Sequence, residues 1–100
     1  MSAAGCGAPQ QGVELSVGAN EVVLSGRVSA EGAPVGGAYV RLLDSSGEFT
    51  AEVVSSEQGE FRFYAAPGDW TVRALHRSGN GEAAVTAGGP GVHAVEVAVA

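Results

Sequence analysis

The chain has 100 residues, the length of one domain, and a chain of this size can bury one modest core. Eleven acidic residues against five arginines and no lysine give a net charge of −6, which opposes the phosphate neutralisation that nucleic-acid binding requires. The apolar residues are mainly 17 Ala and 15 Val, so the core must consist of small side chains. Neither a nucleic-acid partner nor a large pocket with a bound cofactor is expected.

The first residues differ in composition from the rest of the chain. Residues 1–12 contain three Gly and one Pro and show no hydrophobic period, which predicts a flexible tail ahead of a single β domain over residues 13–100. A short alternation at Val13, Leu15 and Val17 predicts a brief edge segment at the start of that domain. No basic and hydrophobic leader and no apolar run of roughly 18 residues is present. We therefore expect a cytoplasmic protein that makes no use of a membrane.

From Glu21 onward, apolar and polar residues alternate between turn signals roughly every 8 to 12 residues, which is typical of a β-sandwich or barrel. This pattern predicts seven strands, over residues 21–29, 38–44, 48–55, 60–65, 69–76, 82–86 and 92–99. Turns are expected between them, over residues 31–34, 44–47, 57–59, 66–68, 78–81 and 87–91. No segment shows a capped helical pattern, and 16 Gly disfavour one, so the domain is predicted to be all β.

The phase of each strand predicts which aromatic side chains are buried. Four rings fall on the inward phase and form the predicted aromatic core: Phe49, Phe61, Phe63 and Trp70. Tyr39 and Tyr64 fall on the outward phase and are candidates for a surface interaction. The Asp44-Ser45-Ser46-Gly47 segment predicts a hairpin turn, because Asp and Ser can cap their own backbone and Gly accepts a positive φ.

Four arginines lie on the outward phase of their strands: Arg27, Arg41, Arg62 and Arg73. They could form an anion-binding row, which makes them surface interaction candidates. The alternative is a set of cross-strand ion pairs with Glu52, Glu60 and Glu96, each worth a few tenths of a kcal/mol. We favour the ion pairs, because most surface charge serves solvation.

His76 and His93 fall near strand ends, without a local carboxylate or a second histidine at ligand spacing. A metal site or an acid–base pair would require both imidazoles to converge in space. We therefore predict no metal site and no catalytic residue, and a small hydrolase built on these two histidines ranks last among the possible functions.

Cys6 is the only cysteine, which excludes an internal disulfide and a Cys-x-x-Cys metal pair. Its neighbours supply no cation or helix N-terminus that would activate the thiol, so activation would have to come from a partner. On the residues alone, Cys6 is either an incidental residue or a thiol on a flexible element that visits the active site of another protein.

Several motifs resemble a known superfamily. The segments Leu24-Ser-Gly-Arg-Val28, Ala33-Pro-Val-Gly-Gly-Ala-Tyr-Val-Arg-Leu-Leu-Asp44, Gly59-Glu-Phe-Arg-Phe63 and Pro67-Gly-Asp-Trp-Thr-Val-Arg-Ala74 resemble the carboxypeptidase regulatory-like repeat of the transthyretin-like (prealbumin-like) superfamily. The resemblance implies a seven-stranded antiparallel Greek-key β-sandwich. Relatives with hydroxyisourate hydrolase activity end in a Tyr-Arg-Gly-Ser-like tail, which this chain lacks.

A narrower resemblance covers nearly the whole chain. Cys6-Gly-Ala-Pro9, the run Val40 to Val54, the run Phe61 to Leu75 and Gly79-Asn-Gly81 look very like the SseC-like family of small actinobacterial proteins of unknown function. Members resemble one another in an N-terminal cysteine and are typically encoded beside rhodanese-type thiosulfate sulfurtransferases. The resemblance implies a link to sulfur metabolism and makes Cys6 the best sulfur-carrier candidate.

Two functions remain open at this point. The favoured one is a non-catalytic accessory protein that docks on a rhodanese-type sulfurtransferase and carries persulfide sulfur on Cys6. The alternative is a structural interaction module that pairs through an edge strand or through a face bearing Tyr39 and Tyr64, without sulfur chemistry.

Overall fold

The computed structural model describes residues 21–100, which form eight strands and no helix. The strands are β1 (Val22–Ala30), β2 (Ala33–Pro34), β3 (Tyr39–Leu43), β4 (Phe49–Val54), β5 (Glu60–Ala65), β6 (Gly68–His76), β7 (Gly79–Ala87) and β8 (Gly91–Ala98). The all-β prediction is confirmed, and no membrane-spanning helix occurs in this part of the chain. The predicted count of seven strands is wrong by one.

The additional strand is β2, in a segment where the sequence predicts only a turn. Glu31 and Gly32 both have positive φ, of 53° and 83°, as a tight two-residue hairpin turn requires. The chain reverses within these two residues, so Ala33 and Pro34 return to pair with Ala30 and Ser29. The predicted turn is therefore shorter than the 31–34 segment.

Sheet A is built around β1, which has a neighbour along each of its edges. One edge pairs antiparallel with β5 and, farther along, with β2. The other edge pairs with β8 in parallel, from Val22 opposite Gly91 to Ser29 opposite Ala98. The parallel pairing corrects the prediction of an entirely antiparallel sandwich.

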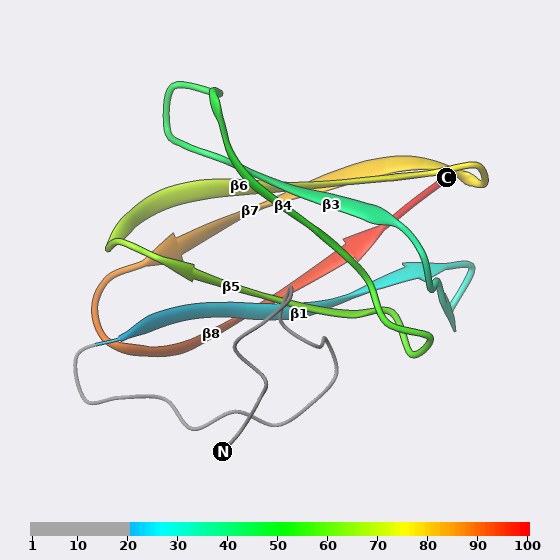
Figure 1. The fold of residues 1–100 in the computed structure, drawn as a ribbon, viewed down its shortest axis with the longest axis horizontal. Coiled ribbons are helices and arrows are strands. Elements are labelled where there is room, and N and C mark those ends of the chain that lie inside the picture. The colour runs from blue at the N-terminus through cyan, green and yellow to red at the C-terminus, as the bar shows by residue number, and fades with distance from the viewer. Residues whose placement is uncertain (1–20) are drawn as a thin grey trace, which may run out of the picture.

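Sheet B has the strand order β4-β3-β6-β7 and is antiparallel throughout. In Figure 1 the ribbons of β3, β6 and β7 lie above those of β1, β5 and β8, which gives the two layers of a sandwich. Buried side chains from both sheets fill the space between the layers, so each sheet has one buried and one outer face.

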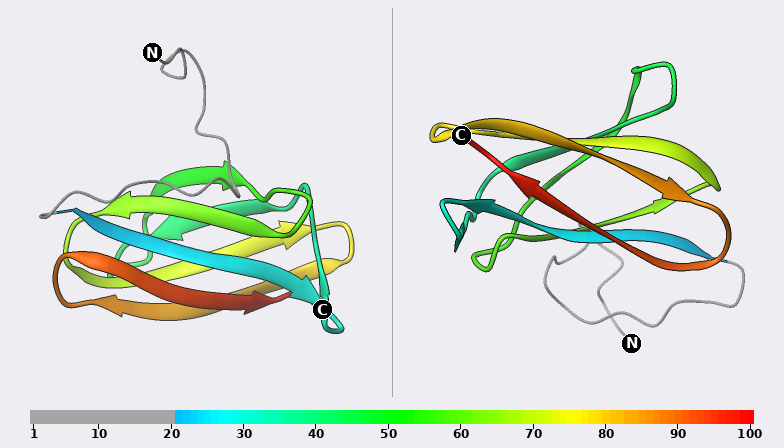
Figure 2. Two further views of the ribbon diagram at one scale, coloured as in Figure 1. Left: turned by 90° about the horizontal axis from the view of Figure 1, so that it is seen from below. Right: turned by 180° about the vertical axis from the view of Figure 1, so that it is seen from behind.

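β7 and the end of the chain close one side of the sandwich, as the view from behind in Figure 2 shows. The amide of Ala100 donates to the carbonyl of Asn80 at 3.2 Å. A Cβ on Gly81 would collide with the carbonyl of Ala98, and one on Gly79 with Ala100. Both glycines lie within β7, where they permit close approach of two backbones. The turn itself occupies residues 77–78, so the predicted turn over residues 78–81 is confirmed in existence but placed too far along the chain.

Small aliphatic residues and two phenylalanines make up the core. Phe61 and Phe63 are buried, with ring centroids 6.0 Å apart and planes tilted by 57°. Phe61 lies directly opposite Gly26 of β1, and a Cβ on Gly26 would come within 2.8 Å of its ring. Trp70 is half-buried against this core, with its indole N–H donating to the carbonyl of Ala66 at 2.9 Å. The predicted inward phase of these three rings is confirmed.

Phe49 is the exception among the predicted core aromatics, since 61% of it is exposed. The pairing of β3 with β4 shifts register between Leu42 and Leu43, so that Leu42 opposes Ala51 but Leu43 opposes Phe49. Thr50 is therefore an extra residue in β4 with no partner on β3. This bulge reverses the inward and outward alternation of the residues that precede it in β4. Phe49 therefore lies on the outer side of sheet B, where it is exposed opposite the buried Leu43, and its prediction as a core residue is wrong.

Ser55 shows how the loop between β2 and β3 is fixed. Its hydroxyl is buried, donates to the carbonyl of Val35 at 2.8 Å and accepts the amide of Ala38 at 2.9 Å. Both polar functions are thus satisfied inside the protein. The loop that carries Gly36 and Gly37 is held in place from both ends.

The predicted hairpin turn at Asp44 is confirmed. One carboxylate oxygen of Asp44 accepts the Ser46 hydroxyl at 2.7 Å and the amides of Ser46 and Glu48 at 2.9 Å each. These donors, the Ser46 hydroxyl first, lower the pKa of the Asp44 carboxyl below its ordinary value of 3.8. Gly47 takes the positive φ of 87° that ends the turn.

The contrast between Phe61 and Phe49 gives a stability prediction. Phe61→Ala is expected to lower the free energy of unfolding by about 3 to 5 kcal/mol, because it opens a cavity beside Gly26. Phe49→Ala is expected to cost less than about 0.5 kcal/mol, because the ring is already exposed. Urea unfolding monitored by circular dichroism measures both, and equal losses would contradict the burial assignments.

The Asp44 turn gives a pH prediction. Because the pKa is lowered in the folded state, the turn's contribution to stability is present above the unfolded pKa and is lost as the pH falls through the folded value. An NMR titration of the Asp44 carboxyl should show a midpoint below 3.8. Ser46→Ala should raise that midpoint and Ser45→Ala should leave it unchanged; no difference between the two variants would exclude the hydroxyl as the main cause.

Candidate functional site

The outer face of sheet B carries a regular array of charged and apolar side chains. Cross-strand partners share a face, so the pairing of the four strands arranges the outward side chains in three rungs. The first rung is Val54, Tyr39, Leu75 and Asn80; the second is Glu52, Arg41, Arg73 and Glu82; the third is Phe49, Leu43, Thr71 and Ala84. We call these twelve residues the sheet B face.

The middle rung is charged and nearly symmetric. Arg41 Nε donates to Glu52 at 2.8 Å, and Arg73 binds Glu82 through Nη2 at 2.9 Å and through Nε at 3.0 Å. The two arginines are direct cross-strand neighbours, which is unfavourable between like charges unless each has a partner. The outer glutamates supply those partners and fix the guanidinium groups at the centre of the sheet B face.

The rungs on either side of the charges are largely apolar, and one member, Leu43, is itself buried, with 7% of it exposed. Tyr39, Val54 and Phe49 are exposed by 55%, 48% and 61%, and they account for three of the five large exposed hydrophobic residues in the described chain. Leu75 is partly buried beside Tyr39. Aromatic residues and arginine are the types enriched in protein interfaces, and clustered exposed apolar residues mark interaction sites.

The favoured prediction of cross-strand ion pairs is confirmed for Arg41 with Glu52 and for Arg27 with Glu60, whereas Arg73 pairs with Glu82, a partner that the sequence did not predict. Besides the two pairs of the sheet B face, Arg27 binds Glu60 at 3.3 Å on the outer face of sheet A. Arg62 also interacts within the protein. These four side chains therefore do not form one continuous row, because they divide between the two outer faces.

Tyr39 and Tyr64 do not share a face, which corrects the prediction of a common Tyr39 and Tyr64 surface. Tyr64 is half-exposed but alternates with buried Phe63 on β5, so it lies on the outer face of sheet A. Tyr39 alternates with buried Val40 on β3 of sheet B. The core separates the two rings, and Tyr64 provides a natural control for experiments on Tyr39.

The two histidines lie at opposite ends of the sandwich. His76 ends β6, beside the hairpin whose Asn80 binds the chain end at Ala100. His93 lies near the start of β8, where its Nε2 is 2.8 Å from the carbonyl of Gly89. The extended chain from His93 to Ala100 spans roughly 20 Å at about 3.3 Å per residue. This separation excludes a hydrolase or metal centre that uses both imidazoles.

Within residues 21–100 the structure shows no cluster of three or more metal-ligating side chains. Cys6, the predicted flexible tail over residues 1–12 and the predicted segment from Val13 to Val17 lie outside the described residues. Within residues 21–100, the sheet B face is the candidate site.

These features define the class of protein as a small all-β domain of the sandwich type. Residues 6–99 match the family model described as "Protein of unknown function (DUF1416)". The chain belongs to this DUF1416 family.

Relatives at high identity come from actinobacteria. The chain is 54% identical over 98 residues to the uncharacterized protein Rv0814c of Mycobacterium tuberculosis, an alignment that covers 94% of this chain and 98% of the relative. It is 58% identical over 90 residues to an uncharacterized protein of Mycolicibacterium smegmatis, covering 89% and 97%. Their names assign no activity.

Solved structures support the fold. A dioxygenase domain from a dioxygenase carbohydrate-binding fusion of Streptomyces sp. SirexAA-E matches with a TM-score of 0.59 at 12% identity, over 87% of this chain and 84% of that one. A DUF3823 family protein from Parabacteroides merdae matches with a TM-score of 0.58 at 20% identity, over 82% of this chain and 47% of that one. Identities this low show the shared fold alone.

Proposed function

We propose that the protein is a non-catalytic accessory module that docks through the sheet B face on a rhodanese-type thiosulfate sulfurtransferase in the cytoplasm. The observation that carries the docking role is the pattern of the sheet B face, in which exposed Tyr39, Val54 and Phe49 flank two positioned arginines. The choice of a sulfurtransferase rests on the resemblance to the SseC-like family.

The same proposal gives Cys6 the role of sulfur carrier. The Cys6 thiolate attacks the terminal sulfur of the enzyme's cysteine persulfide. A new sulfur–sulfur bond forms on Cys6, and the old bond breaks with its electron pair leaving on the enzyme's cysteine as thiolate. Thiosulfate supplies the transferred sulfur to the enzyme and leaves as sulfite, so the transfer from enzyme to Cys6 needs no further oxidant or reductant.

Docking through the sheet B face predicts a selective effect of tyrosine truncation. Tyr39→Ala should weaken binding to the sulfurtransferase by about tenfold, the cost typical of an aromatic interface residue. Tyr64→Ala removes a similarly exposed ring from the outer face of sheet A and should leave the affinity unchanged. Titration calorimetry measures both, and a loss confined to Tyr64→Ala would place the interface on sheet A instead.

The carrier role predicts a mass change that depends on Cys6. After incubation with a rhodanese and thiosulfate, the intact protein should gain one sulfur, about 32 Da, which a thiol reductant removes. Cys6→Ser should gain nothing while binding the enzyme as the wild type does. Binding without any Cys6-dependent mass gain would leave the alternative function, an interaction module with no sulfur chemistry.

A further inference from the structure

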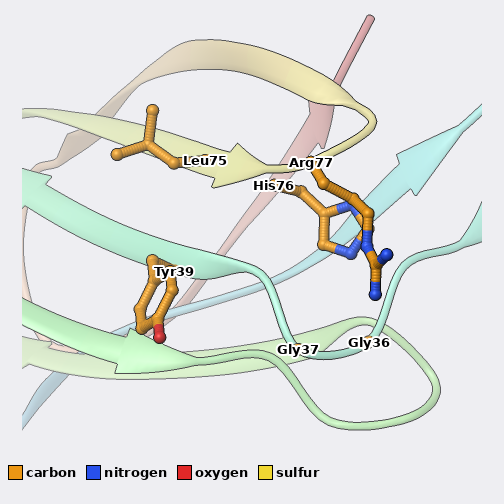
Figure 3. A pocket seen from close by; sticks show the side chains of 6 residues that line it. All are labelled: Gly36, Gly37, Tyr39, Leu75, His76 and Arg77. Atoms are coloured by element: carbon orange, nitrogen blue, oxygen red, sulfur yellow. The ribbon is translucent and has the colours of Figure 1, made fainter.

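A second surface feature lies at the corner of sheet B, where β6 ends beside the loop before β3. An open pocket of about 500 Å³ is lined there by Gly36, Gly37, Tyr39, Leu75, His76 and Arg77. Figure 3 shows His76 and Arg77 extending from the end of β6 toward the Gly36–Gly37 loop, with Tyr39 and Leu75 on the neighbouring strands. Volumes of this order hold small organic ligands.

Arg77 differs from the other arginines of the described chain. Arg27, Arg41 and Arg73 form ion pairs and Arg62 is engaged, whereas no ion pair or hydrogen bond of Arg77 occurs within residues 21–100. The backbone of Glu57 passes close to Gly36, yet its carboxylate makes no ion pair with Arg77. The N–H donors of the planar Arg77 guanidinium can therefore bind a ligand.

His76 adds a second donor at the same end of the pocket. Its Nδ1 accepts the backbone amide of Ser78 at 3.1 Å, which assigns the proton of the neutral ring to Nε2. The Ser78 hydroxyl lies 3.0 Å from the same Nδ1 and holds the ring orientation. The Nε2–H has no partner within the described chain and is available beside Arg77.

The rest of the pocket is uncharged. Leu75 and Tyr39 are cross-strand neighbours that both line the pocket and supply the apolar part of its lining, here called the apolar wall. Gly37 has a positive φ of 76°, and a Cβ placed on it would meet no atom within 4 Å, so the loop leaves that side open. Gly36 packs closely on Ser56 and Glu57 and anchors the loop.

We propose that this pocket binds a carboxylate attached to an apolar body, such as an aromatic acid. The carboxylate lies between the Arg77 guanidinium and the His76 Nε2–H, and the apolar body lies against Tyr39 and Leu75. The planar guanidinium matches the two oxygens of a carboxylate, and the apolar wall selects against small inorganic anions. The site shares Tyr39 and Leu75 with the sheet B face, but Arg77 and His76 lie outside that face, so ligand binding can be tested separately from docking.

The test is an NMR titration of the ¹⁵N-labelled full chain with phenylacetate. The amides of Gly36, Gly37 and Arg77 should shift in a saturable way. Arg77→Gln should weaken the affinity by about fivefold, the upper range for an exposed ion pair. Arg27→Gln makes the same charge change on the outer face of sheet A and should leave the affinity unchanged.

Three results would overturn the proposal: no saturable shift at the pocket, equal affinities for Arg77→Gln and the wild type, or inorganic phosphate binding as tightly as phenylacetate. A peptide with a free C-terminal Phe carboxylate, compared with its amide, then identifies the source of the ligand. Tighter binding of the free-acid peptide than of phenylacetate indicates a polypeptide terminus, and weaker binding indicates a free small acid.

Discussion

The packing of the Phe61 ring over Gly26 is the interaction on which the described structure depends. The two residues are direct cross-strand partners on β1 and β5, and Phe61 is the largest fully buried side chain in a core made mainly of valine and alanine. A Cβ on Gly26 would also collide with the backbone of Val95 on β8. The missing side chain of Gly26 thus leaves room both for the backbone of β8 and for the Phe61 ring on the inner face of sheet A.

Once sheet A has its inner face fixed, sheet B must bury Val40, Leu42, Val72 and Ala74 against it. Their neighbours along β3 and β6 then face outward, which places Tyr39, Arg41, Arg73 and Leu75 side by side. The glutamates of β4 and β7 complete the charged rung from both sides. The pattern of the sheet B face is therefore a direct consequence of how the core is packed.

Much of the fold could be predicted from the sequence because it rests on local alternation. β5 has the predicted bounds, and the inward phase of Phe61, Val72 and Val95 follows from period two. Local patterns do not reveal pairing partners, so they missed the register shift that turns Phe49 outward and the parallel neighbour of β1. They also read Gly79 and Gly81 as a turn, because the chain end that approaches them is distant in sequence.

The candidate sites could likewise be predicted only in part from local alternation. The outward phase of Arg41, Arg73 and Tyr39 was visible in the sequence, but their arrangement in rungs depends on strand order. The pocket at Arg77 joins a loop held by buried Ser55 to a hairpin forty residues away in the chain, and no sequence spacing signals it. In a β-sandwich, local alternation determines which residues face outward, whereas strand order and register determine which of them lie side by side.

The central claim is that the sheet B face carries the docking function, and interface mapping tests it most directly. In an NMR cross-saturation experiment, the labelled protein is mixed with a rhodanese-type sulfurtransferase and saturation is read at each amide. Saturation transfer is predicted at the amides of β3 and β4 and at residues 71–75 of β6, with Tyr39, Phe49 and Arg73 among the affected positions. Transfer confined to β1, β5 and β8, around Arg27 and Tyr64, would contradict it.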